Sequence, residues 1–151
     1  MEELGRLLDE DPGLIEAEGY THPPLLFAAV AGSTDAARLL LDRGAAVNRR
    51  DGQGWTALLA ACGYGRAEMV KLLLDRAADP LLRTKGGSTA LMAASVAEER
   101  PGSDHVAVIR LLIKDGRLPV DARSDAGCTA LLDACFYGFA DRARVLLMEG
   151  W

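Results

Sequence analysis

The chain has 151 residues with a formal net charge of −5, and half of it is hydrophobic although only 5% is aromatic, so it suits one ordinary domain of closely spaced, Ala- and Leu-rich helices. The acidic balance argues against a nucleic-acid partner, which needs a clustered basic face, and against binding to an anionic membrane surface. No apolar run reaches the roughly 20 residues of a transmembrane helix, and the acidic residues that follow Met1 are unlike the basic start of a signal peptide. Three cysteines cannot all be paired in disulfides within the chain, which favours a reducing cytoplasm.

Residues 1–11 predict an amphipathic helix. Leu4, Leu7 and Leu8 share one face, charged side chains cover the other, and Pro12-Gly13 ends the segment. Counted back from the first repeat described below, Leu7-Leu8 falls where a later repeat carries Leu72-Leu73-Leu74. The segment therefore resembles the second helix of a repeat that lacks its first helix, and it can cap the end of a stack.

A two-helix motif then recurs four times, with a period of about 33 residues and one longer interval. Each copy opens with a Thr or Pro before a hydrophobic helix and continues into a second helix rich in leucine and other aliphatic residues. The openings are Pro23-Pro24-Leu25, Thr56-Ala57-Leu58, Thr89-Ala90-Leu91 and Thr129-Ala130-Leu131. The first two copies predict helices over Pro24–Ala31, from Ser33 or Thr34 to about Asp42, over Ala57–Tyr64, and from about Ala67 to Arg76.

This repeated pattern resembles the ankyrin repeat family, and the resemblance covers nearly the whole chain. It implies an all-α repeat solenoid of helix-turn-helix units that are joined by β-turn or hairpin fingers. The expected units are a capping half-repeat at 1–18 and repeats at 19–50, 51–83, 84–123 and 124–151. The family's motif has a His that ties the helix start to the finger, but that position here holds Leu26, Leu59, Met92 and Leu132. We therefore expect apolar packing to replace the polar tie.

The third repeat carries six extra residues, Glu98 to Ser103, between its two helices. We expect this insertion at the edge of the stack opposite the fingers, either as a tolerated surface loop or as a specificity loop that reaches over the neighbouring repeat. The fourth repeat ends at Trp151, and its Arg142 stands where the two preceding repeats have Met69 and Val108. A charge at a stacking position indicates that little packs beyond this repeat, although a truncated chain is equally compatible with the sequence.

The two histidines and three cysteines of the chain form no pattern that is typical of a catalytic site. His22 and Cys128 share a repeat position, yet they lie three repeats apart, beyond the hydrogen-bond reach that a Cys–His dyad needs. No cluster has metal-ligand spacing. Cys62 and Cys135, at matching places on the first helices, are expected to be small buried hydrophobes. We therefore expect no catalytic residue, metal or cofactor, and a protein that is not an enzyme.

The resemblance implies a partner site in the concave groove. In ankyrin proteins this groove is lined by the finger tips, by the residue before the motif Thr and by the last turn of the first helix. Five of the eight aromatic residues fall at these positions, and Tyr and Trp are enriched at interface hot spots. The alternative for some of them, Trp55 among them, is packing between repeats. The candidate partner-binding residues are Tyr20, His22, Gln53, Trp55, Tyr64, Lys85, Ser88, Asp125, Cys128, Phe136 and Tyr137.

The sequence thus predicts a non-catalytic, cytoplasmic and monomeric module that holds a protein or peptide, with Trp55, Tyr64 and Tyr137 as anchors. An alternative is a structural role as a spacer, a self-assembling stack or a fragment of a longer ankyrin array. Exposed apolar surface on the fourth repeat would favour that alternative. A third interpretation is an accessory domain of a larger protein whose catalytic part lies elsewhere.

Overall fold

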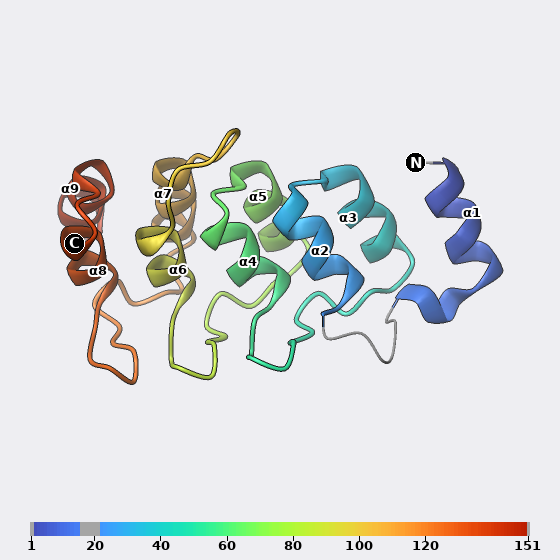
Figure 1. Cartoon of the computed structure of the whole chain (residues 1–151), viewed down its shortest axis with the longest axis horizontal. Coiled ribbons are helices and arrows are strands. Elements are labelled where there is room, and N and C mark those ends of the chain that lie inside the picture. Colours follow the sequence, from blue (N-terminus) through green and yellow to red (C-terminus); the bar gives the residue numbers. More distant parts are fainter. Residues whose placement is uncertain (1, 16–21, 151) are drawn as a thin grey trace.

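Paired helices stand side by side along the molecule (Figure 1). The structure is a computed structural model that describes residues 2–15 and 22–150. Within these residues four helix pairs follow a single N-terminal helix and there is no strand, as expected for an all-α repeat solenoid.

We call the first helix of a pair helix A and the second helix B, and we number the pairs as repeats one to four. The elements are α1 (Glu2–Glu10), the short 3₁₀ helix η1 (Pro12–Ile15), α2 (Pro24–Ala31), α3 (Thr34–Asp42), α4 (Ala57–Gly63), α5 (Ala67–Asp75), α6 (Ala90–Val96), α7 (His105–Asp115), α8 (Ala130–Phe136) and α9 (Ala140–Glu149).

Helix A begins after a threonine in three of the four repeats. The side-chain oxygens of Thr56, Thr89 and Thr129 accept hydrogen bonds from the backbone N–H three residues later, at 3.2, 3.3 and 3.2 Å. An N-cap of this kind contributes about 1 kcal/mol. Repeat one uses Pro23 and Pro24 instead, because a proline in the first turn gives up only an N–H that has no helical partner. The four helices predicted for repeats one and two are confirmed to within a residue at each end.

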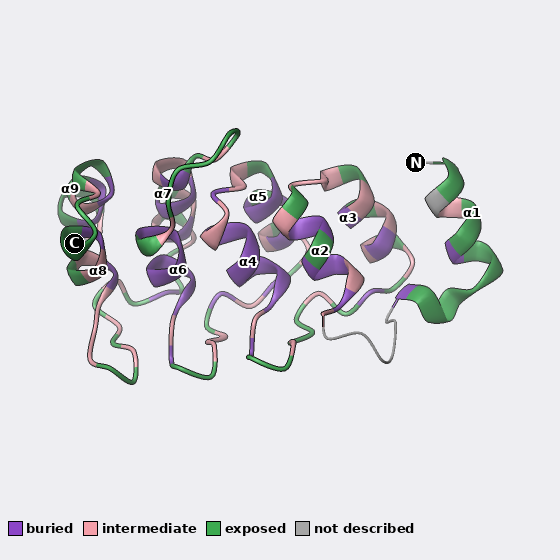
Figure 2. Ribbon diagram, in the orientation of Figure 1, coloured by how far each residue is buried: buried purple, intermediate pink, exposed green. Residues whose placement is uncertain are grey.

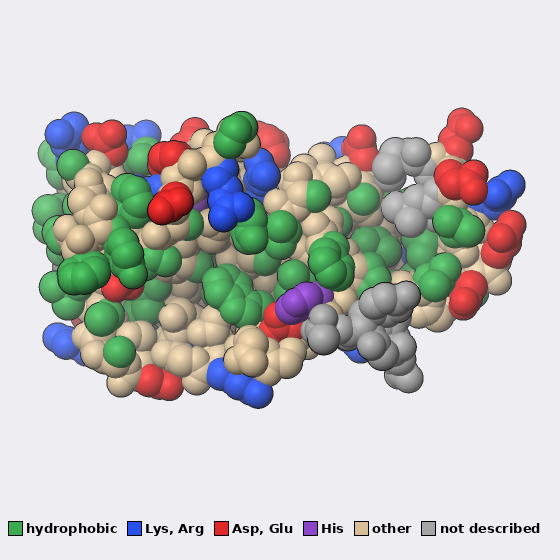
Figure 3. Space-filling model, viewed as in Figure 1, with side chains coloured by type: hydrophobic (Ala, Val, Ile, Leu, Met, Phe, Trp, Pro, Cys, Tyr) green, Lys and Arg blue, Asp and Glu red, His purple; other side chains and the backbone are tan. Residues whose placement is uncertain are grey.

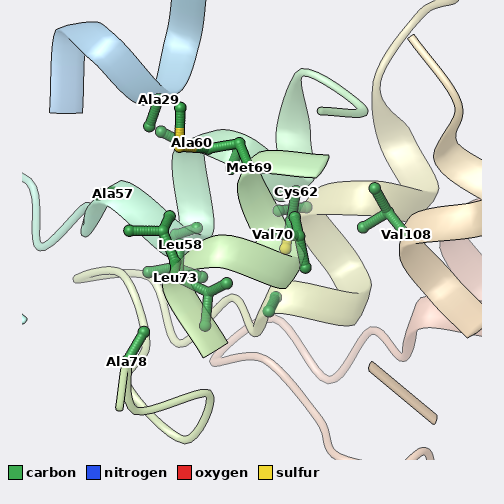
Figure 4. Packing of buried hydrophobic residues seen from close by; sticks show 14 of the residues in the cluster. Ala29, Ala57, Leu58, Ala60, Cys62, Met69, Val70, Leu73, Ala78 and Val108 are labelled. Atoms are coloured by element: carbon green, nitrogen blue, oxygen red, sulfur yellow. The ribbon is translucent and has the colours of Figure 1, made fainter. Parts of the chain in front are cut away.

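The core follows the contacts between successive repeats, where small residues of helix A let the helices approach. Ala29, Ala61 and Ala94 are fully buried, and α2, α4, α6 and α8 pack against one another in that order. Between the two helices of repeat two, Leu58 and Leu73 lie together and are 1% and 0% exposed (Figure 4). Each such leucine contributes about 1.5–3 kcal/mol. Burial is therefore concentrated in the middle of the stack, while α1 and the loop before α7 are mostly exposed (Figure 2).

The connections between repeats form a row of fingers that project from one edge of the stack (Figure 1). Three fingers carry an arginine at the same place, and in the first two of them it binds the next finger. Arg50 donates from Nη2 to the carbonyl oxygen of Arg83, and Arg83 donates from Nη1 to that of Arg123 at 2.9 Å. Arg123 donates to Gly127 of its own finger at 3.3 Å. The expectation that apolar packing takes over from the family's polar tie was therefore incomplete, because guanidinium groups tie finger to finger.

Helix α1 lies in the place of a helix B, as its leucines indicated. Arg43 binds Asp9 at 2.9 Å, and one repeat later Arg76 binds Asp42 at 2.7 Å. The same ion pair thus links α1 to repeat one and repeat one to repeat two. Leu8 anchors α1 in the core at 3% exposure. Because no helix A accompanies α1 in the described residues, this unit is half a repeat.

Candidate functional site

The A helices and the fingers together form one face of the stack, which we call the groove face (Figure 3). Hydrophobic side chains gather in a band over the A helices, and polar and charged side chains follow the row of fingers. Five candidate residues are exposed: Gln53, Lys85, Asp125, Phe136 and Tyr137. Five others are half-buried: His22, Trp55, Tyr64, Ser88 and Cys128. Tyr20 lies outside the described residues.

Backbone hydrogen bonds hold the finger tips to one another. The N–H of Lys85 donates to the carbonyl of Gln53 at 2.9 Å, and the N–H of Asp125 donates to that of Gly86 at 3.2 Å. Because the tips are bonded backbone to backbone, the exposed side chains of Gln53, Lys85 and Asp125 stand in a row on a fixed support. Such a row can present polar contacts to an extended partner without first being ordered.

One carboxylate, that of Asp51, organises three candidate residues. Its Oδ1 accepts from the backbone N–H groups of Gln53 and Trp55 at 2.8 and 2.9 Å, which closes the finger turn. Its Oδ2 lies 2.9 Å from Nδ1 of His22, and the Asp51 side chain is 3% exposed against 42% for His22. This role of Asp51 was not predicted from the sequence, since His22 belongs to the preceding connection.

Trp55 is half-buried because its ring lies over helix α4. A Cβ atom at Gly63 would lie 3.8 Å from Cζ3 of Trp55 and 3.9 Å from Cβ of Ala93. The ring therefore packs in part against the core. Packing between repeats, the alternative to partner binding that the sequence allowed for Trp55, is thus present. The rest of the ring surface remains accessible.

The insertion in repeat three projects from the edge opposite the fingers (Figure 1), and it reaches over repeat two. The guanidinium carbon of Arg100 lies 4.9 Å from the centre of the Tyr64 ring, a cation–π contact. Two hydrogen bonds join the loop to repeat two, from Arg66 Nη1 to the Pro101 carbonyl at 3.3 Å and from the Asp104 N–H to the Gly65 carbonyl at 2.8 Å. A partner that contacts Tyr64 would therefore meet Arg100 as well.

The other end of the insertion binds a buried arginine of repeat four. Arg142 is 2% exposed, and its Nη2 donates to Oε1 of Glu99 at 2.6 Å and to Nδ1 of His105 at 3.2 Å. Its Nη1 donates to the carbonyls that end α6, those of Ala94, Ser95 and Ala97. A cation is favourable there because the carbonyl end of a helix is negative. Arg142 therefore gives no indication of what packs beyond repeat four, since its side chain turns inward to repeat three.

These contacts fix the charge states around Arg142. Its hydrogen bond holds the pKa of Glu99 below the usual value, and burial lowers the pKa of His105. Since Nδ1 of His105 accepts from Arg142, the proton lies on Nε2, which donates to the carbonyl of Gly63 at 3.3 Å. A neutral histidine and a charged Glu99–Arg142 pair therefore join repeats two, three and four.

Repeat four exposes an aromatic cluster, Phe136 and Tyr137, at the end of α8. These two residues are 84% and 56% exposed, their rings meet edge to face at 5.2 Å between centroids, and Tyr137 stacks on Phe139 at 6.4 Å. Cys135 in the same turn is exposed, so the expectation of a buried thiol was wrong there. At the matching place Cys62 is buried, which raises the pKa of its thiol. The two cysteines differ because α6 packs on the outer side of α4.

The first half of the chain carries a family signature. Compared with known protein families, residues 3–84 match the family described as ankyrin repeats (3 copies), which is more than half of the chain. The chain belongs to the ankyrin repeat family. A comparison with curated proteins gives no match. In the described part of this ankyrin chain no helix is long and apolar enough to cross a bilayer, and no three His, Cys, Asp or Glu side chains are placed to hold a metal ion.

Two large, exposed apolar side chains on the A helices of the ankyrin stack fall outside the family's partner positions. Phe27 on α2 is 57% exposed and meets His22 edge to face at 5.7 Å, and Leu132 on α8 is 54% exposed. The sequence could have indicated Phe27, because this large aromatic residue stands where the next two repeats have the small residues Ala60 and Ala93. Leu132 carries no such signal, since a leucine or methionine fills this position in every repeat.

Proposed function

We propose that this ankyrin stack is a non-catalytic module that binds a protein or peptide partner along its groove face. Ankyrin repeats are generally protein–protein interaction modules. The observation that carries the proposal is the exposed cluster of Phe136 and Tyr137 at the end of an A helix, on a groove face whose fingers are tied backbone to backbone. Aromatic side chains bury a large area at a small cost in side-chain entropy, so a fixed aromatic cluster is suited to act as a binding hot spot.

The groove face favours a partner segment with apolar anchors and charges of both signs. The fingers present Lys85 and Asp125, and the insertion presents Arg100, all of them exposed. The partly accessible rings of Trp55 and Tyr64 would contact apolar side chains of the partner. The other candidate residues, Gln53, Ser88, Cys128 and His22, would add polar contacts at the edge of these rings.

We further propose a monomer in a reducing cytoplasm. All three cysteines are free thiols, and Cys135 is exposed. An exposed thiol is open to disulfide exchange in an oxidising compartment. A monomer also leaves the fingers and the aromatic cluster free for a partner.

Affinity capture followed by titration tests the groove. The double variant Phe136→Ala/Tyr137→Ala removes the exposed cluster and leaves the core intact. Met148→Ala is the matched control, because Met148 is 76% exposed on a helix B rather than on the groove face. We expect a protein that the wild type and the control hold and that the double variant loses. With that partner, Tyr137→Ala and Trp55→Ala should each weaken binding by about 2 kcal/mol or more, roughly thirtyfold in Kd. Equal capture by all variants would exclude the groove.

A second candidate function, assembly through the end of repeat four, is favoured by its exposed apolar surface. Leu132, Leu147 and Met148 are 54%, 55% and 76% exposed. Leu147 and Met148 line a hollow of about 570 Å³, together with residues that include Ala134, Cys135, Gly138, Ala140 and Ala143. Leu59, at the position of Leu132, is 1% exposed because the next repeat covers it. This end face therefore suits a further repeat or a second copy, as in a spacer or a longer array.

Sedimentation over a wide concentration range tests this second function. Assembly through the end face predicts that the average mass rises with concentration and that Leu132→Glu restores the monomer. Phe27→Glu is the control, since Phe27 is equally exposed at the other end of the stack. A wild type that stays monomeric throughout would argue against self-assembly.

A further inference from the structure

A largely apolar cavity of about 550 Å³ lies between α1 and repeat one. Its walls include Leu7 and Leu8 of α1, Leu14 of η1, and Phe27, Ala28 and Ala31 of α2. Three of these side chains, those of Leu7, Leu14 and Phe27, are 41%, 41% and 57% exposed, so a large apolar area faces the cavity. We call this cavity the half-repeat slot.

The slot occupies the place of a helix A. The ion pairs Asp9–Arg43 and Asp42–Arg76 put α1 in the same position as α3, one repeat earlier. In that position Leu7 corresponds to Leu40 and Leu73, which are 4% and 0% exposed. The two later leucines are buried because α2 and α4 pack on α3 and α5. Leu7 is exposed because no helix packs on α1 in the same way within the described residues.

The repeats themselves show what such a slot holds. In all four repeats the place beside helix B is filled by a two-turn helix, and each of α2, α4, α6 and α8 also packs on the A helix next to it. These four helices have a common chemistry. Apart from Ser95 in α6 and Asp133 in α8 they are apolar, they carry a leucine at the second helical position, and they have alanines where they meet a neighbour, as in Ala90-Leu91-Met92-Ala93-Ala94.

The wall of the slot on α2 differs from its counterparts at one residue. Phe27 stands where α4 and α6 have Ala60 and Ala93. Ala93 lies close to the preceding helix α4, because a Cβ atom added at Gly63 would be 3.9 Å from the Cβ atom of Ala93. A helix in the slot must therefore stand farther from α2 than α4 stands from α6. Its side toward Phe27 must also be made of small residues, so that the exposed ring is covered rather than displaced.

We infer that the half-repeat slot binds a short apolar α-helix of a partner protein, which then packs beside α1 in the manner of a helix A. The helix has about two turns, a leucine directed between Leu7 and Leu40, and alanine or glycine toward Phe27. The site is separate from the exposed aromatic cluster on α8. The interface it completes is of the kind that already joins the A helices of the chain, where side chains of two helices interdigitate.

A peptide taken from the chain itself is the probe. Residues 87–97, with two lysines added for solubility, contain α6 with its Thr89 cap and no cysteine or aromatic residue. We expect saturable binding to the full chain, followed by NMR, with methyl shifts at Leu7, Leu8 and Leu14. The control peptide carries Leu91→Glu and Ala94→Glu, which place charges on two apolar positions of α6 that are 1% and 0% exposed in the chain.

Two protein variants locate the site. Leu7→Arg and Ala31→Arg change walls of the slot at accessible positions and preserve helix propensity, so the fold should survive in both, and circular dichroism checks this. Each should weaken peptide binding by about tenfold or more, whereas Met148→Arg at the far end should change it by less than about twofold. If Leu7→Arg perturbs α1, the Ala31→Arg result decides.

Four outcomes would overturn the inference. They are absence of saturable binding, equal binding of the control peptide, shifts confined to α8 and α9, and a wild-type self-association that Leu7→Arg abolishes. The last would assign the slot to a second copy of the chain. The variant Phe136→Ala/Tyr137→Ala should bind the peptide like the wild type, so the slot and the groove succeed or fail separately.

Discussion

Repeat two and repeat four place similar residues at matching positions and give them opposite surroundings. Leu59 is 1% exposed and Leu132 54%, and Cys62 is sealed in the core whereas Cys135 is exposed. The residue type does not decide burial here. What decides it is whether another repeat packs on the outer side of helix A.

The two repeats also differ in what holds helix B. In repeat two the buried residue at the stacking position is Met69, which contributes only apolar contact. In repeat four it is Arg142, which is equally buried but binds three carbonyls, Glu99 and His105. A stack thus tolerates a charge at this position when a helix end and a carboxylate neutralise it.

Truncating the matched leucines gives the largest expected difference. Leu59→Ala should lower the free energy of unfolding by about 2–5 kcal/mol, because it opens a cavity in the core. Leu132→Ala should lower it by less than about 1 kcal/mol, since half of that side chain is already in water. Urea denaturation monitored by circular dichroism measures both. Equal losses would mean that repeat four has a covered face in solution.

Removing the buried arginine is the next largest change. Arg142→Ala should cost about 1–3 kcal/mol, because the carbonyls that end α6 lose their donor while the freed Glu99 remains in contact with water. Arg142→Met, which copies repeat two, should recover part of that loss through apolar contact. The same denaturation experiment compares the two. If methionine stabilises beyond the wild type, the charge contributes specificity rather than stability.

The residue that follows helix B differs between repeat one and repeat two, and its backbone conformation favours repeat one. Ala77 in repeat two has a φ of +62°, where Gly44 in repeat one has +93°. We expect Ala77→Gly to raise the free energy of unfolding by about 0.5–1 kcal/mol and Gly44→Ala to lower it by about 1 kcal/mol. No atom lies within 4 Å of a Cβ at Gly44, so the backbone alone sets that cost. Opposite signs in thermal unfolding are the expected result, and like signs would contradict it.

The smallest expected effect depends on pH and concerns His105. Its pKa in the folded chain lies below the usual value of about 6.5, because burial disfavours the charged ring. Its share of the stability is therefore complete above about pH 6.5 and is lost as the pH falls through that value toward the lowered pKa. Stability measured in steps from neutral to mildly acidic pH should decline in the wild type and decline less in His105→Gln. Identical profiles would show that the ring does not titrate on unfolding.

Much of the fold follows from local signals in the sequence. The Thr or Pro openings and the repeated leucines placed the helices of repeats one and two, and the leucines put α1 in the position of a helix B. The groove residues were chosen by the same repetition, and their part in binding stays a prediction. The features that were missed depend on contacts between repeats. Cys135 was misjudged because its surroundings are set by the outer face of α8. The burial of Arg142 was missed because it depends on α6, and the role of Asp51 was missed because His22 reaches it from another connection.

The insertion has a consequence for how the stack opens. In a regular repeat array each unit touches only its neighbours, so an end unit can fray while the rest stays closed. Here one loop belongs to two interfaces, with Arg100 on Tyr64 of repeat two and Glu99 on Arg142 of repeat four. Fraying of repeat four releases Glu99 and loosens the hold on repeat two. Amide hydrogen exchange in α8 and α9 should therefore proceed at nearly the rate of α6, so that the C-terminal three repeats open as one cooperative unit.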